Sequence, residues 1–192
     1  MRRAARLGLG ALGLMWATTL WGCNLTPGEG RFDAERLDYG DCEENVMPWE
    51  PGFYTVDRFE QTVTIRLQDI GGNFEGVDGV FFQLDREYVA ERRGQEIPMG
   101  LPAEDGEIHV RGTLGFFASC PGNGRVTPDL RGTIRFSRFE PFNDGQISAR
   151  VTAPQVVDER TGEVIGENLE GEFSFLVQKG RPYTNFTGPG TE

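Results

Sequence analysis

Two runs in the last third of the chain, Gly132-Thr-Ile-Arg-Phe-Ser137 and Ile147-Ser-Ala-Arg-Val151, decide the fold class. In both runs apolar residues alternate with polar ones, which is the pattern of a β-strand with one buried face. Asn143-Asp-Gly145 lies between them, and Asp-Gly favours a tight hairpin turn because both residues tolerate a positive φ. We therefore expect an antiparallel hairpin in this region.

The same alternation extends to most of the chain. It is clear at 62–68, 80–84, 108–117 and 169–177, and the turn formers at 159–162 predict a second hairpin. A helical period is weak throughout, and we expect at most one turn of helix near 34–37 or 88–93. Strands with one apolar face must bury that face against another layer. The sequence thus predicts an all-β fold with low helix content, an antiparallel β-sandwich, with a small lipocalin-like β-barrel as the alternative.

Three strands share a short pattern of glycine, polar, apolar, any residue and phenylalanine. It begins at Gly112, Gly132 and Gly171 and ends at Phe116, Phe136 and Phe175. A row of phenylalanines could bind a ligand, but residues two positions apart on a strand also point to the same side. We favour the interpretation that these phenylalanines are core residues.

The N-terminus has the layout of a secretory signal peptide. Arg2, Arg3 and Arg6 precede an uncharged, mostly apolar run from Leu7 to Leu20. The run is too short, and too rich in glycine, for a permanent membrane-spanning helix. An ordinary cleaved signal is the other alternative, but no strong Ala-x-Ala site precedes Cys23.

The end of this segment, Leu20-Trp-Gly-Cys23, resembles the lipobox of bacterial lipoproteins. The resemblance covers residues 1–23 only, and it implies cleavage after residue 22 and a lipid on Cys23. It also implies a protein held in the bacterial cell envelope by that lipid. Asn24 is not the aspartate that favours inner-membrane retention, so we expect the outer membrane, on its periplasmic or surface face.

Counting cysteines supports this interpretation. The chain has Cys23, Cys42 and Cys120, an odd number that leaves one thiol unpaired in an oxidising compartment. If Cys23 carries lipid, Cys42 and Cys120 can form a disulfide. Two reduced structural cysteines are the alternative, which fits an exported chain less well.

The expected domain layout follows from these features. Residues 1–22 are the signal peptide, and residues 23–52 are the lipidated cysteine with an acidic tether and entry loop. Residues 53–180 form a single β domain, and residues 181–192, rich in Pro, Gly and Thr, form a flexible tail. The acidic residues around Cys42 lack the regular spacing of a calcium loop, so we expect a solvated charged loop there.

Charge and motifs exclude several classes of function. The formal net charge is −11, which repels nucleic acid, so no nucleic-acid partner is expected. No cofactor motif, Cys/His metal spacing or Gly-x-Ser-x-Gly sequence occurs, and His109 is the only histidine. We therefore expect no enzyme activity and no cofactor. A hydrolase with two catalytic carboxylates is a weaker alternative, for which the available side chains are Glu104, Asp105, Glu107, Asp158 and Glu159.

Two classes of function remain. The first is a structural or protein-interaction module tethered to the membrane, with a partner in the envelope. The second is a carrier or binder of a small apolar or carbohydrate ligand, which needs a cavity or an aromatic platform. Aromatic residues near predicted loops could supply that platform: Trp49, Tyr54, Phe74, Tyr88, Phe139, Phe142, Tyr183 and Phe186.

Overall fold

The computed structural model describes residues 28–38, 46–69, 77–120 and 127–177. Its strands are β1 (Gly28–Leu37), β2 (Phe53–Phe59), β3 (Thr62–Gln68), β4 (Asp78–Asp85), β5 (Ile97–Met99), β6 (Val110–Phe116), β7 (Asp129–Phe139), β8 (Gln146–Val157) and β9 (Val164–Leu176). A short helix, α1 (Arg86–Glu91), follows β4. The all-β, antiparallel prediction is confirmed, as is the low helix content.

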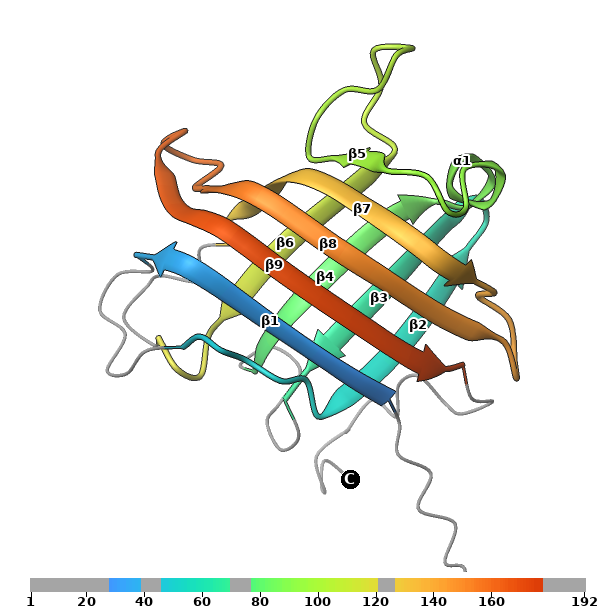
Figure 1. The fold of residues 1–192 in the computed structure, drawn as a ribbon, viewed down its shortest axis with the longest axis horizontal. Helices are drawn as coiled ribbons and strands as arrows, with labels where there is room; N and C mark the ends of the chain where they lie inside the picture. Colours follow the sequence, from blue (N-terminus) through green and yellow to red (C-terminus); the bar gives the residue numbers. More distant parts are fainter. Residues whose placement is uncertain (1–27, 39–45, 70–76, 121–126, 178–192) are drawn as a thin grey trace, which may run out of the picture.

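All the strands belong to one antiparallel sheet, in the order β1-β9-β8-β7-β6-β4-β3-β2, with β5 paired to β7. The sheet curls over between β7 and β6, where only two residue pairs are in register. It therefore forms two layers whose strands cross (Figure 1). We call β1, β9, β8 and β7 the front layer, and β6, β4, β3 and β2 the back layer. Strand β1, at one end of the sheet, also contacts the segment that precedes β2 through one bridge, in which Phe32 and Trp49 exchange hydrogen bonds of 2.8 Å.

Aromatic rings fill the space between the layers. Phe173 of β9 stacks on Phe82 of β4 with ring centroids 5.5 Å apart, and on Phe32 of β1 at 6.4 Å. The ring of Phe32 lies directly over Gly171, where a Cβ atom would come within 2.2 Å of it. Only glycine at position 171 therefore allows this approach. The phenylalanines of the repeated pattern, Phe116, Phe136 and Phe175, are all buried, which supports their assignment to the core.

Both predicted hairpins are present. The first joins β7 to β8, and Asp144 in its turn has a φ of 64°. The second joins β8 to β9, where the amide of Gly162 donates to the carbonyl of Asp158 at 2.7 Å. The helical turn expected near 88–93 also exists, as α1. Its N-cap is Asp85, whose side chain accepts from the amides of Glu87 and Tyr88, which is the usual role of aspartate at this position.

The predicted domain boundary at residue 53 is wrong. Residues 28–37, which we expected to belong to the tether, form strand β1, paired with β9 along most of its length. The helical turn expected at 34–37 is part of this strand. Only Phe32 of β1 is fully buried, so apolar and polar residues alternate little in the sequence of this strand. Pairing with a strand more than 100 residues away decides its conformation instead. Residues 1–22, 39–45 and 181–192 lie outside the described residues.

Candidate functional site

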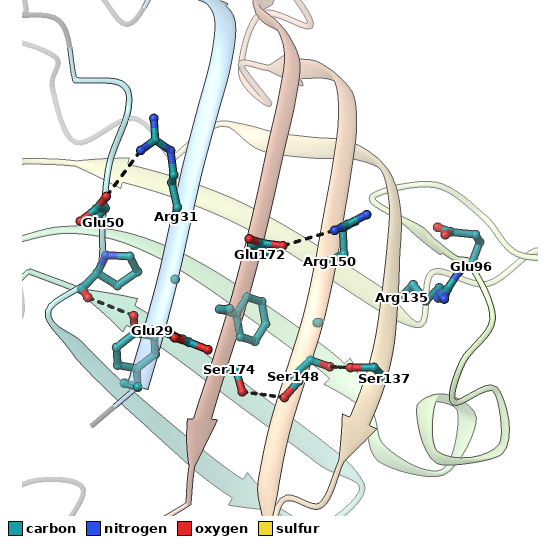
Figure 2. Close-up of a pocket in the computed structure, with 16 residues that line it drawn as sticks. Glu29, Arg31, Glu50, Glu96, Arg135, Ser137, Ser148, Arg150, Glu172 and Ser174 are labelled. Atoms are coloured by element: carbon teal, nitrogen blue, oxygen red, sulfur yellow. Dashed lines mark hydrogen bonds and ion pairs between the residues drawn. The ribbon is translucent and has the colours of Figure 1, made fainter. Parts of the chain in front are cut away.

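Alternation along the front layer places polar side chains on its outer face. In register across the strands, Ser148 lies opposite Ser174, and Arg150 lies opposite both Glu172 and Arg135. Glu172 in turn lies opposite Arg31 of β1. These residues line an open hollow of about 880 Å³, which we call the polar groove (Figure 2). Its labelled residues are Glu29, Arg31, Glu50, Glu96, Arg135, Ser137, Ser148, Arg150, Glu172 and Ser174.

Short hydroxyl side chains form the centre of the polar groove. The Oγ atoms of Ser148 and Ser174 are 2.8 Å apart, and the Ser137 hydroxyl donates to the carbonyl of Ser148 at 3.3 Å. The Gln146 side-chain amide donates to Ser174 at 3.1 Å. Because serine is small, this row is lower than the arginines and glutamates beside it. A ligand lying across the strands would meet hydroxyl groups that can both donate and accept.

Charged groups of both signs border the serine row. Arg150 pairs with Glu172 at 3.3 Å, and Arg31 pairs with Glu50 at 3.6 Å (Figure 2). Both pairs are largely exposed, so each contributes little to stability. Their chemical capacity lies in binding, since guanidinium and carboxylate groups at the surface can exchange an internal partner for a ligand.

The phenol of Tyr54 lines one side of the polar groove. Its hydroxyl donates to the carbonyl of Pro51 at 3.0 Å. Burial, with the negative charges of Glu29 and Glu50, raises the pKa of Tyr54 to about 12. The phenol is therefore neutral at any physiological pH, and it acts as a hydrogen-bonding and packing group.

A second polar cluster surrounds His109, just before β6. Its Nε2 lies 2.8 Å from a carboxylate oxygen of Asp105, and its Nδ1 lies 3.3 Å from one of Asp85. The ring stacks on Tyr88 at a centroid distance of 3.6 Å, and the guanidinium of Arg92 lies 3.7 Å from the centre of the Tyr88 ring. We call this arrangement the histidine clasp, because it joins the loop containing Asp105 to the start of α1.

Protonation should strengthen the histidine clasp. A neutral imidazole can donate only one hydrogen bond, whereas the imidazolium donates two. Burial lowers the pKa of His109, but the hydrogen bonds to Asp105 and Asp85 and their negative charges outweigh burial and raise the pKa above 6.5. The resulting stabilisation is complete below the ordinary pKa of about 6.5 and is lost as the pH rises through the higher, folded-state pKa.

We predict that His109→Gln reduces stability more at acidic than at alkaline pH. The difference in free energy of unfolding between wild type and variant should be largest about two units below the ordinary histidine pKa and smallest about two units above it. Urea unfolding at both pH values measures this difference. A constant difference, or one that grows with pH, would contradict the assigned direction of the pKa shift.

The predicted cysteine site is only partly visible. Cys120 is 2% exposed and disulfide-bonded, whereas Cys23 and Cys42 lie outside the described residues. The pairing of Cys42 with Cys120 therefore stays a prediction. The turn before Cys120 is held by the buried carboxylate of Asp78, which accepts hydrogen bonds from the amide of Ala118 at 2.8 Å and from the amide and hydroxyl of Ser119.

The candidate aromatic platform is not assembled by the described residues. Trp49, Tyr54 and Phe139 are buried in the core, and Tyr88 belongs to the histidine clasp. Phe142 is 53% exposed, while Phe74, Tyr183 and Phe186 lie outside the described residues.

The carboxylates that the sequence offered for a hydrolase lie in two loops. Two of them stabilise the loops in which they lie. Asp105 is bonded to His109, and Asp158 accepts from the amide of Arg160 at 2.8 Å and pairs with its guanidinium at 3.4 Å. Hydrogen bonding, first to the backbone amides of Glu107 and Arg160 respectively, lowers the pKa of both carboxyls. They are therefore ionised turn residues. Glu104, Glu107 and Glu159 belong to the same two loops, and the structure gives them no ion pair with a described residue.

Sequence reasoning missed both the polar groove and the histidine clasp. Alternation in β8 and β9 showed that Ser148 and Ser174 face outward, but their alignment depends on the register between the two strands. For the clasp, the available signal was a lone histidine four residues after Asp105. Among the described residues, no group of three or more His, Cys, Asp or Glu side chains is arranged so that it could hold a metal ion.

No protein-family model matches the chain, and no curated protein or solved structure matches it significantly. The fold and the site define it as an antiparallel β domain with an open polar groove on one face. Within the described ranges, no helix is long and apolar enough to cross a membrane.

Proposed function

We propose that the chain is a lipid-tethered protein of the bacterial envelope whose β domain is a non-catalytic interaction module. In this proposal, lipid on Cys23 holds the domain at the outer membrane, and the polar groove binds a polar component of the envelope. The signal-peptide layout and the lipobox-like residues 20–23 support the tether.

The proposal that the domain binds a polar partner rests on where the structure is hollow. Between the layers, the stacked rings of Phe32, Phe82 and Phe173 occupy the interior, whereas the polar groove opens on the outer face of the front layer, with Tyr54 of β2 at one side. An apolar carrier would need an apolar cavity. The groove instead offers hydroxyl, guanidinium and carboxylate groups, which favours a polar partner over a small apolar ligand.

The chemistry of the polar groove also favours binding over hydrolysis. Its serine hydroxyls bond to one another and to a backbone carbonyl, and the histidine that could activate a serine is in the clasp beside Asp85 and Asp105. Nucleophilic catalysis by serine needs a base within hydrogen-bonding distance. This observation supports a module that recognises its partner without changing it.

Filling the polar groove should weaken binding to the envelope. We expect the mature chain with Cys23→Ser, which carries no lipid, to bind isolated envelopes saturably in a sedimentation assay. Adding Ser148→Trp should weaken this binding at least about tenfold, because a large ring replaces the lowest part of the groove. Gln83→Trp is the matched control, since Gln83 is exposed on the opposite, back layer. Equal binding by both tryptophan variants would refute the groove as the binding surface.

A further inference from the structure

Arg135 of β7 differs from most outward-facing arginines around it. Arg31, Arg36, Arg138 and Arg150 each have a carboxylate partner. Arg135 is exposed and forms no ion pair with any residue that the structure describes. A guanidinium group carries five N–H donors, so Arg135 retains its full capacity to bind an anion.

The pairing of β7 with β8 places a second arginine beside Arg135. Arg135 lies directly opposite Arg150 on β8, and like charges in such cross-strand pairs are destabilising. Glu172 pairs with Arg150 at 3.3 Å, which neutralises one of the two guanidinium groups and leaves the other available. An anion bound at Arg135 would remove the remaining repulsion, so the site favours a ligand with negative charge at this point.

The surrounding groups limit what else the ligand can carry. Glu96 lies beside Arg135, and Glu172 lies on the other side of Arg150 (Figure 2). These carboxylates repel a ligand with dense negative charge, such as a nucleic acid or polyphosphate. They accept hydrogen bonds from hydroxyl groups, and the hydroxyls of Ser137 and Ser148 in the same groove can donate or accept. The groove thus suits a ligand with isolated acidic groups among many hydroxyls.

A polysaccharide in which uronate units are separated by neutral sugars has this composition. Each uronate unit carries one carboxylate, which can form a bidentate pair with a guanidinium, and its hydroxyls match the serines and glutamates. Resting on the function proposed above, we propose that the polar groove binds an acidic polysaccharide, with Arg135 pairing with a uronate carboxylate. Arg135 is then the residue that distinguishes acidic from neutral glycans.

The test compares a neutral oligosaccharide that carries one galacturonate unit with its methyl ester, which has the same sugar rings but no charge. Isothermal titration with the mature chain carrying Cys23→Ser should give at least about tenfold tighter binding of the free acid. Arg135→Gln should remove this preference, and Arg135→Lys should keep part of it. Arg138→Gln, on the same strand, is the control and should behave as wild type. Thermal unfolding checks that each variant is folded.

Three results would overturn the uronate proposal: equal binding of acid and ester by wild type, no saturable binding of either oligomer, or a preference that survives Arg135→Gln. If the uronate proposal fails while envelope binding still depends on Ser148, the proposed function stands with another partner. If Ser148→Trp has no effect on envelope binding, the groove itself is excluded. The two failures are therefore distinguishable.

Discussion

Phe173→Ala is expected to lower the free energy of unfolding by about 3–5 kcal/mol, the range for truncating a large aromatic side chain in a core. Phe173 is 3% exposed and contacts the rings of Phe32, Phe82 and Phe175. It therefore joins the front layer to the back layer. The truncation removes these contacts and leaves a cavity that a sheet held by many backbone hydrogen bonds can only partly fill.

Urea unfolding followed by tryptophan fluorescence measures the effect, since Trp49 lies in the same core. Phe142→Ala is the matched control, because Phe142 is 53% exposed and its truncation should change stability by less than about 0.5 kcal/mol. A loss below about 1 kcal/mol for Phe173→Ala would show that the aromatic stack does not hold the layers together.

The second large effect concerns the predicted Cys42–Cys120 disulfide. Breaking it with Cys42→Ser should lower the free energy of unfolding by about 4 kcal/mol, because a long loop is released in the unfolded chain. Cys120 is buried and disulfide-bonded, and the only other cysteines of the chain are Cys23 and Cys42. We expect Cys42→Ser and Cys120→Ser to have similar effects. The double variant should be no less stable than the less stable of the two single variants.

Cys23→Ser provides the control for this pairing. In a lipid-free mature chain it should leave stability within about 0.5 kcal/mol of the parent, because in this pairing Cys23 takes no part in the disulfide. A large loss with Cys23→Ser together with no loss for Cys42→Ser would show that Cys120 is bonded to Cys23 instead. That result would remove the argument that Cys23 is free for lipid.

Local patterns account for the parts of the fold that could be predicted. The β7–β8 hairpin combines two alternating runs with a turn at Asp144 that adopts a positive φ, and such signals lie within a few residues of one another. The core positions of Phe116, Phe136 and Phe175 follow from the same alternation. Strand β1 could not be predicted in this way, because its conformation depends on pairing with β9 at the far end of the sequence.

The candidate site was harder to predict for the same reason. Ser137, Ser148 and Ser174 belong to three strands, and a bulge between Phe136 and Arg138 alters the register of the first. A change of one residue in pairing would reverse the faces of a strand and remove the serine row. The histidine clasp likewise joins Asp85 and His109, which lie 24 residues apart. Both sites therefore depend on tertiary geometry rather than on a sequence motif.

The central claim is that this β domain works at a membrane, held there by lipid on Cys23. Intact mass spectrometry of the protein made in a bacterial host with its own signal tests it most directly, beside Cys23→Ser. We predict a chain that begins at Cys23, carries a diacylglyceryl group absent from the variant, and gains the mass of two hydrogen atoms on reduction. A mature chain without lipid, or one cleaved elsewhere, would contradict the claim and make a freely secreted protein the correct description.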